Sequence, residues 1–208
     1  MSMKILTFET TEEWLLARFK RLTGSKVSDV VVKRGTGQKI GFYRLIAEHI
    51  VNPGIEDLEK PMDRGQTLEP EALDRYEEMA GVKLDRTKVL WVREDNDNMA
   101  ISPDATKAES NNTEAYEVKC LSSANHIKAF ITQQIPEEYH YQMLQYFIVN
   151  DALEKLTFVF YDPRLRVRDL FTITITRAEV LAELEELAIY ERNLLENVQA
   201  EVDKLLTF

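Results

Sequence analysis

Apolar side chains recur every three or four residues over much of the chain, which is the spacing of one face of an α-helix. The pattern predicts a first helix at residues 10–22 and a long last helix at residues 177–206, whose apolar stripe predicts a packed face. Ser25 is expected to begin a second, short helix that runs to Val32. Further helices are predicted at residues 40–50, 67–80, 123–132 and 137–149.

Short runs that are rich in β-branched and aromatic residues predict strands. They lie at residues 89–92, 99–102, 115–120, 156–161 and 170–176. Helices precede, separate and follow these strands, with no repeat or linker between them. We therefore expect an α/β fold in a single domain over residues 1–208, with a mixed central β-sheet flanked by helices. Its core would span about residues 10–176, followed by the long helix.

Composition narrows the class of protein only slightly. Of the 208 residues, 44% are hydrophobic and 30% charged, as in ordinary soluble proteins. No apolar run approaches the roughly 20 residues of a membrane-spanning helix. The single cysteine, Cys120, and the lack of a signal-peptide pattern predict a cytoplasmic protein. The net charge of −10 argues against a protein that coats nucleic acid with its whole surface, but is compatible with a local basic channel.

Two successive predicted strands carry a pattern typical of metal-dependent phosphodiester cleavage. A Ser-Pro-Asp triplet ends the first at Asp104, and a Glu-Val-Lys triplet lies in the next. Alternate side chains of a strand share one face, so Glu117 and Lys119 should project together. Carboxylates suit Mg²⁺ or Mn²⁺, and an ammonium group can hold the attacking water. We expect Asp104, Glu117 and the backbone carbonyl of Val118 to bind the metal, and Lys119 to serve the water.

Further short motifs surround these triplets in a fixed order. They are Trp14-x-x-x-Arg18, Thr23-Gly24-Ser25, Arg64-Gly65-x-x-Leu68-Glu69-Pro70-x-Ala72, Tyr139-x-x-Gln142 and Tyr161-Asp162-Pro163-Arg164. Together, over residues 14–164, they resemble the lambda-type exonucleases, the YqaJ-like viral recombinase branch of the PD-(D/E)xK nuclease superfamily. The resemblance implies a restriction-endonuclease-like core.

The same resemblance implies roles for side chains outside the two triplets. Glu69 and Gln142 would support the metal cluster as further catalytic residues. Arg18, Ser25 and Ser102 would bind the 5′-phosphate of the digested strand, for which a guanidinium group and hydroxyls are suitable partners.

The chain departs from the family pattern at Ala105, Leu121 and Leu144, where the family commonly has glycine, proline and a second polar residue. None of these departures removes a metal ligand.

The basic, glycine-rich stretch at residues 33–39 lacks the ending of a P-loop and the spacing of a dinucleotide-binding loop. We expect it to contact DNA phosphates through its cations, with a plain solvated loop as the alternative. These cations are Lys33, Arg34 and Lys39. The three histidines show no metal-binding spacing, and Cys120 is expected to be a buried thiol beside the strand that carries Glu117.

The resemblance implies a Mg²⁺-dependent 5′→3′ exonuclease, with Mn²⁺ as a substitute, that acts on linear double-stranded DNA. It would leave 3′ single-stranded tails for recombination. It also implies a ring-shaped homotrimer around DNA, a single-strand annealing partner and a phage or prophage origin. Two alternatives are a structure-specific or restriction-type endonuclease of the same superfamily, and a catalytically inactive relative that binds DNA or assists assembly.

Overall fold

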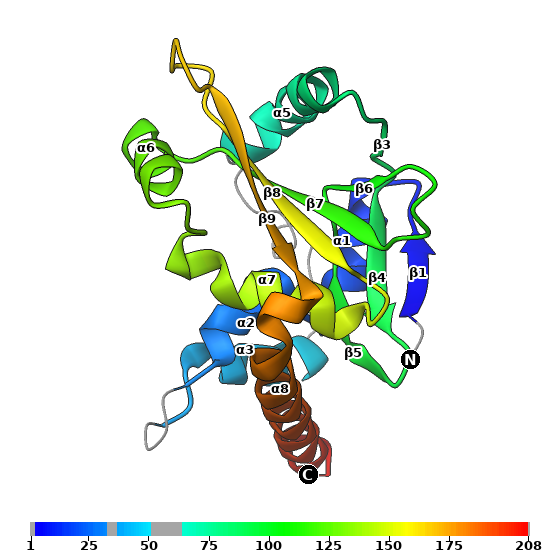
Figure 1. Ribbon diagram of the computed structural model, residues 1–208. Coiled ribbons are helices and arrows are strands. Elements are labelled where there is room, and N and C mark those ends of the chain that lie inside the picture. The colour runs from blue at the N-terminus through cyan, green and yellow to red at the C-terminus, as the bar shows by residue number, and fades with distance from the viewer. Residues whose placement is uncertain (1–2, 33–36, 51–63, 208) are drawn as a thin grey trace.

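The structure, a computed structural model, describes residues 3–32, 37–50 and 64–207 (Figure 1). Its helices are α1 Thr11–Arg18, α2 Gly24–Val30, α3 Ile40–Ile50, α5 Arg64–Ala80, α6 Ser123–Thr132, the 3₁₀ helix η1 Glu137–Tyr139, α7 His140–Val149 and α8 Arg177–Leu206. Its strands are β1 Met3–Thr7, β2 Leu22–Thr23, β3 Leu84–Asp85, β4 Val89–Arg93, β5 Asn96–Ile101, β6 Ala105–Lys107, β7 Glu114–Lys119, β8 Lys155–Tyr161 and β9 Leu170–Thr176.

The strands form two sheets. The larger has the order β3-β6-β7-β8-β9, in which β7 and β8 run parallel and the other pairs antiparallel. The smaller has the order β1-β4-β5-β2. The chain leaves the smaller sheet after β5 at Pro103, which has no N–H to offer a ladder. The predicted mixed α/β fold is confirmed, but the strands divide between two sheets where one was expected.

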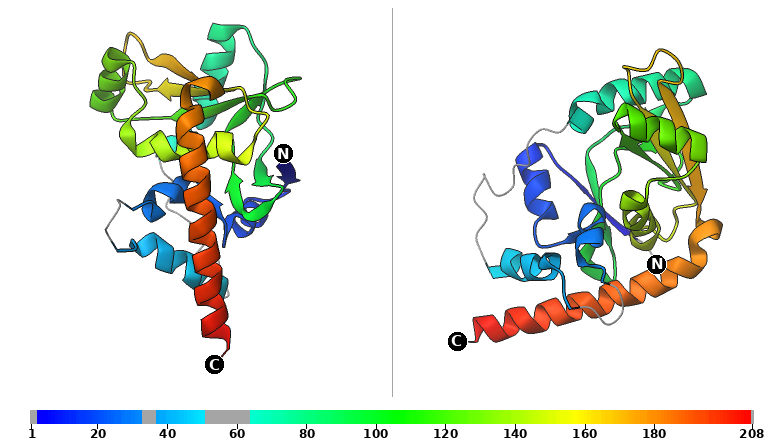
Figure 2. Two further views of the ribbon diagram at one scale, coloured as in Figure 1. Left: turned by 60° about the horizontal axis from the view of Figure 1, so that its bottom comes forward. Right: turned by 90° about the vertical axis from the view of Figure 1, so that its left-hand side faces the viewer.

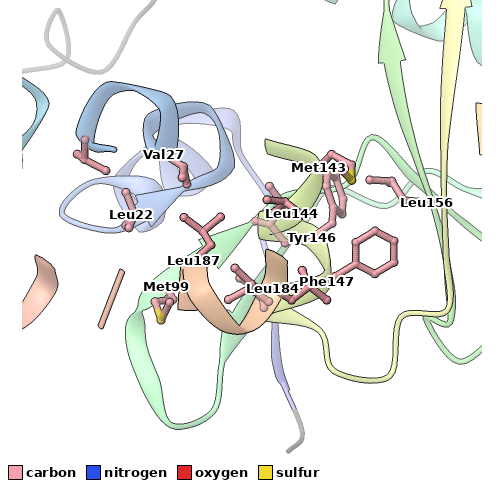
Figure 3. Packing of buried hydrophobic residues seen from close by; sticks show 14 of the residues in the cluster. Leu22, Val27, Met99, Met143, Leu144, Tyr146, Phe147, Leu156, Leu184 and Leu187 are labelled. Carbon is pink, nitrogen blue, oxygen red and sulfur yellow. The ribbon is translucent and has the colours of Figure 1, made fainter. Parts of the chain in front are cut away.

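Both faces of the larger sheet are covered by apolar contacts. Phe158 and Phe160 of β8 enter the main core with α7 and α8, of which Figure 3 shows a part. Val159 and Tyr161 enter a second core, which Ala72 and neighbouring residues of α5 complete. Side chains of a strand that is buried on both faces are apolar at successive positions, which explains the run from Phe158 to Tyr161 in β8.

The long predicted helix is confirmed as α8, which spans 30 residues. It runs from β9 past α7 and α3 toward the C-terminus (Figure 2). A capping box between Thr176 and Glu179 marks its start, and a buried stripe from Val180 to Val202 faces the core. Leu205 and Leu206 beyond the stripe are exposed. No helix among the described residues is long and apolar enough to cross a membrane.

Several boundaries differ from the prediction. The first helix ends at Arg18, and Lys20 adopts a positive φ of 67° before the chain turns into β2. Thr23, rather than Ser25, occupies the position before α2. Helix α5 begins earlier than expected and holds Pro70 in its interior.

Candidate active site

The end of β7 forms the centre of the candidate site. Glu117 is 4% exposed, and its Oε1 lies 2.7 Å from Lys119 Nζ. The two side chains therefore share one face of the strand, as the alternation predicts. Val118 points the other way and packs into the second core, where the half-buried Cys120 also contributes.

A short strand that the sequence did not predict brings Asp104 to the same place. Asp104 immediately precedes β6, and its N–H donates to the carbonyl of Tyr116 at 3.2 Å. Asp104 Oδ2 in turn accepts the N–H of Val118 at 2.7 Å. The expectation that Asp104 ends the strand next to β7 is thus wrong in detail. The neighbour of β7 is β6, at whose start Asp104 lies, because the chain has already left β5 at Pro103.

The backbone of Val118 faces the same edge of β7. In a strand, the N–H and C=O of one residue point to the same side, and the Val118 N–H points to Asp104. The pairing of β6 with β7 covers Ala105 and Thr106 and so begins after Asp104. The Val118 carbonyl is therefore directed to the Asp104 side of β7, as its predicted role in metal binding requires.

Helix α7 supplies two hydrogen bonds to the Glu117 carboxylate. Gln142 Nε2 donates to Oε1 at 2.7 Å, and the Tyr146 hydroxyl donates to Oε2. Residues four apart lie on one face of a helix, so both side chains reach the same acid. Gln142 Oε1 accepts a hydrogen bond from Lys119 Nζ at 3.1 Å. Glu117, Lys119 and Gln142 therefore form a closed triangle of contacts.

Three acids lie close enough to affect one another's ionisation. Burial, followed by repulsion from Glu117 and Glu69, raises the pKa of Asp104 well above its ordinary value. Burial and the charge of Glu117 also raise the pKa of Glu69, which reaches the cluster from α5, while Lys88 and Lys119 oppose this rise. This concentration of carboxylates in a partly dry place disfavours their charged forms. A bound cation would reverse that preference.

Lys119 remains a cation in this environment. Burial alone would lower its pKa, but the attraction of Glu117 and Asp104 and the hydrogen bond to Glu117 outweigh burial and raise the pKa. Its Nζ also lies 4.3 Å from the centroid of the Tyr139 ring. Lys119 is thus suited to hold water and to stabilise negative charge, rather than to act as a neutral base.

Arg18 and Ser25, two predicted phosphate ligands, lie next to each other beside the acids. Arg18 Nη2 is 3.4 Å from Ser25 Oγ, and the guanidinium carbon is 4.3 Å from the centroid of the Trp14 ring. Burial lowers the pKa of Arg18, against the opposing effects of Glu117, Tyr146 and Asp104. The guanidinium group therefore interacts electrostatically with the acid cluster.

Ser102, the third predicted phosphate ligand, already has partners within the protein. Its hydroxyl donates to the carbonyl of Val89 at 2.6 Å and accepts the Trp14 indole N–H at 3.0 Å. A serine hydroxyl has a single hydrogen to donate. A phosphate could receive this hydrogen only by displacing the Val89 carbonyl. In the structure, the Ser102 hydroxyl instead holds the Trp14 indole in place.

The structure places the predicted basic loop only in part. Lys33 and Arg34 lie outside the described residues. Lys39 Nζ donates to the carbonyl of Ser28 at 3.0 Å and so links the start of α3 to α2. None of the contacts described for Lys39 brings it to the acids.

The oxygen donors at the site suit a hard divalent cation. Asp104, Glu117 and the Val118 carbonyl offer the ligand chemistry that Mg²⁺ and Mn²⁺ prefer. Within the described ranges, no three Asp, Glu, His or Cys side chains come together as a complete metal site. Two carboxylates and a carbonyl agree with the habit of Mg²⁺ of keeping several waters.

The sequence motifs assigned no role to three side chains at the site, namely Tyr146, Trp14 and Lys88. Tyr146 could have been found from its four-residue spacing to Gln142. Trp14 was recognised only as part of a motif. No sequence pattern indicates a role for Lys88, because folding alone brings its Nζ to 5.0 Å from the Trp14 ring centroid.

Three solved structures whose architecture is similar to that of the chain are of exonucleases. LHK-Exo, described as an alkaline exonuclease from Laribacter hongkongensis, matches with a TM-score of 0.76, 27% identity and coverage of 95% of this chain and 97% of that chain. Its complex with dAMP matches with a TM-score of 0.76, 28% identity and coverage of 94% and 96%. A phage-related exonuclease from Haemophilus somnus 129PT, at 13% identity, a TM-score of 0.57 and coverage of 90% and 95%, shows likeness of fold alone.

No curated protein matches the chain. The family model of the YqaJ-like viral recombinase domain matches residues 13–153, which include the candidate acids, Lys119 and Gln142. This match covers more than half of the sequence and agrees with the resemblance that the motifs indicated. The chain therefore belongs to the YqaJ-like viral recombinase family.

Proposed function

We propose that the chain is a Mg²⁺-dependent exonuclease that digests one strand of linear double-stranded DNA from its 5′ end. The observation that carries the proposal is the meeting of Asp104, Glu117 and Lys119 at one end of β7, with Arg18 and Ser25 beside them. Family membership and the likeness to LHK-Exo support an exonuclease. The dAMP in one LHK-Exo crystal is a mononucleotide of the kind that stepwise digestion releases.

The proposed reaction is hydrolysis of the bond between phosphorus and the 3′ oxygen of the terminal nucleotide. Mg²⁺ or Mn²⁺ held by Asp104, Glu117 and the Val118 carbonyl would supply the Lewis acid. The Lys119 ammonium group would position the water whose oxygen attacks phosphorus, and would stabilise the negative charge that develops. The leaving 3′ oxygen takes up a proton as that bond breaks.

The remaining polar residues would fix the geometry of this step. Gln142 and Tyr146 hold the Glu117 carboxylate in one orientation. Glu69 adds negative charge near the metal ligands. Arg18 and Ser25, with Ser102 if it releases Val89, would bind the terminal 5′-phosphate and so select DNA ends.

Digestion of three substrates tests the proposal. Linear duplex with a 5′-phosphate should be digested with Mg²⁺ but not with EDTA, linear duplex with a 5′-hydroxyl more slowly, and closed circular duplex not at all. Cleavage of the circle would favour the endonuclease alternative. No digestion of any substrate with Mg²⁺ or Mn²⁺ would favour the inactive one.

Substitution of Lys119 tests the assignment of the site. Lys119→Met keeps most of the side-chain volume and removes the charge, and we expect it to slow digestion by roughly 100-fold or more. Lys155→Met, at the exposed start of β8, makes the same charge change away from the acids and is the matched control. Wild-type digestion by Lys119→Met would show that the site is wrongly assigned.

The assembly around the enzyme is also a proposal. We propose a homotrimer that encloses DNA, together with a single-strand annealing protein that binds the emerging 3′ tails. Since the family is one of viral recombinases, a phage or prophage origin and action in the bacterial cytoplasm fit this proposal.

A further inference from the structure

Lys88 is a cation at the edge of the candidate site that the proposed reaction does not use. It lies in the chain immediately before β4 and is exposed. Its Nζ donates to Thr11 Oγ1 at 3.4 Å and lies 5.0 Å from the centroid of the Trp14 ring. An ammonium group has three N–H donors, so this single long hydrogen bond to the described residues leaves donors for a ligand.

The Trp14 ring next to Lys88 makes a hydrogen bond through its indole N–H and cation–π contacts through its ring. The indole N–H donates to Ser102 Oγ, which is fixed in turn by the Val89 carbonyl. The ring also carries the guanidinium group of Arg18 at 4.3 Å. A ring that already attracts two cations is suited to positioning positive charge rather than to stacking on a base.

The two cations on Trp14 belong to different parts of the site. Arg18 contacts Ser25, in the predicted pocket for the terminal phosphate. Lys88 instead lies near Glu69, since its charge lowers the pKa of that acid against the effects of burial and Glu117. Trp14 therefore joins the terminal-phosphate side of the site to the α5 side.

We propose that Lys88, supported by the Trp14 ring, binds an internal backbone phosphate of the DNA, on the 3′ side of the phosphate that is cleaved. This inference rests on the proposed function. A scissile phosphate at Asp104 and Glu117 has the terminal phosphate on one side, where Arg18 lies, and the next internal phosphate on the other. Among the described cations beside the acids, Arg18 is assigned to the terminal phosphate and Lys119 contacts Glu117 and Gln142, which leaves Lys88 for that second phosphate.

Binding of a 3′-labelled linear duplex, measured by fluorescence anisotropy in EDTA, tests the inference without cleavage. Lys88→Ala should weaken binding by roughly fivefold and reduce the slope of log K against log salt by about 1, on 5′-phosphorylated and 5′-hydroxyl ends alike. Arg18→Ala should weaken binding mainly on phosphorylated ends. Lys155→Ala is the matched control and should bind as the wild type does.

A duplex with one neutral methylphosphonate at the proposed internal position makes the test specific. The wild type should lose affinity for this duplex by about the same factor as Lys88→Ala loses on ordinary DNA, and Lys88→Ala should be indifferent to the change. Lys88→Arg should restore sensitivity. Equal sensitivity of Lys88→Ala and the wild type would overturn the inference, as would a Lys88→Ala effect confined to phosphorylated ends. If the wild type itself binds no duplex, the proposed function fails instead.

Discussion

Asp104 is an acid whose charge costs the folded protein stability. Its carboxylate accepts the Val118 N–H but lies among Glu117 and Glu69, and burial and these neighbours raise its pKa. Metal-binding acids are arranged in this way because the cation compensates for their repulsion. Under the proposed function, metal binding and stability therefore make opposite demands at this position.

Replacement of Asp104 by asparagine should separate the two demands. The asparagine amide keeps an oxygen for the Val118 N–H and removes the charge, so we expect Asp104→Asn to raise the Tm of the metal-free protein by a few degrees. Digestion with Mg²⁺ should be lost. Thermal unfolding in EDTA near pH 8 and the digestion assay measure the two effects, and a lower Tm would contradict the account of repulsion given above.

At the scale of elements, α2 and α7 approach each other closely at Gly24. A Cβ at this position would overlap Ile101 Cδ1 and come within 3.1 Å of Gln142 Cγ. Since Gln142 holds both Glu117 and Lys119, the absence of a side chain at Gly24 lets α7 present Gln142 to the acids.

We expect Gly24→Ala to lower the free energy of unfolding by about 1–3 kcal/mol through overpacking. It should reduce kcat more than it weakens DNA binding, because the displaced group contacts the acids rather than the DNA end. Gly37→Ala is the control, since a Cβ there meets nothing within 4 Å. If Gly24→Ala has the same stability and kcat as this control, the packing of α2 against Ile101 and Gln142 is not tight.

A buried acid also couples α8 to α7. Glu191 is fully buried, and burial raises its pKa to about 8, against the opposing effects of Arg93 and Gln145. The Gln145 amide lies between Glu191 and the carbonyl of Leu22. Turned one way, its nitrogen donates to Leu22 O at 3.3 Å; turned the other way, it donates to the Glu191 oxygens at 2.6 and 2.9 Å.

The raised pKa fixes the sign of a pH effect on stability. Between the ordinary glutamate pKa of 4.5 and the folded value of about 8, the folded state binds the extra proton. Stability therefore falls as pH rises through this range, by up to about 1.4 kcal/mol per pH unit. Glu191→Gln should flatten this part of the curve and be the more stable form above pH 8. Urea unfolding from pH 5 to 9 measures it, and parallel curves would refute the assignment.

The sequence predicted elements well where the pattern was long and poorly where it was short. Helices α3, α6 and α8 and strand β9 match their predicted bounds, since each contains several periods of its pattern. Strands β2, β3 and β6 have only two or three residues, too few for a period to show. Yet β6 sets the position of Asp104, so the acids were predicted and their geometry was not.

At the scale of the whole molecule, the proposed homotrimer has a direct test. Light scattering after gel filtration should give three times the 24.2 kDa mass of the chain. Exposed apolar side chains of α3 and the end of α8, among them Tyr43 and Leu205, line a groove on the surface. A monomer at micromolar concentration would contradict the trimer and leave the nuclease site assignment untouched.

The order of the elements along the chain could be predicted, whereas the way that distant segments meet could not. Trp14 and Ser102 are 88 positions apart and Tyr190 and Val30 are 160 apart, yet each pair shares a hydrogen bond. Such contacts depend on the packing of complete elements, and no local pattern carries that information. The family motifs supplied this long-range information for Gln142, because Gln142 belongs to one of them. Lys88 belongs to none of the motifs, so its place at the site could not be predicted.

Strand β7 is the middle strand of the larger sheet, and it carries Glu117 and Lys119. Its amide hydrogens should therefore be among the slowest to exchange with solvent, opening only when the whole sheet opens. On gradual heating, digestion should persist until cooperative melting and then cease, so that inactivation and unfolding share one midpoint. The enzyme would pass directly from fully competent molecules to unfolded ones, with no population of folded but catalytically impaired molecules between them.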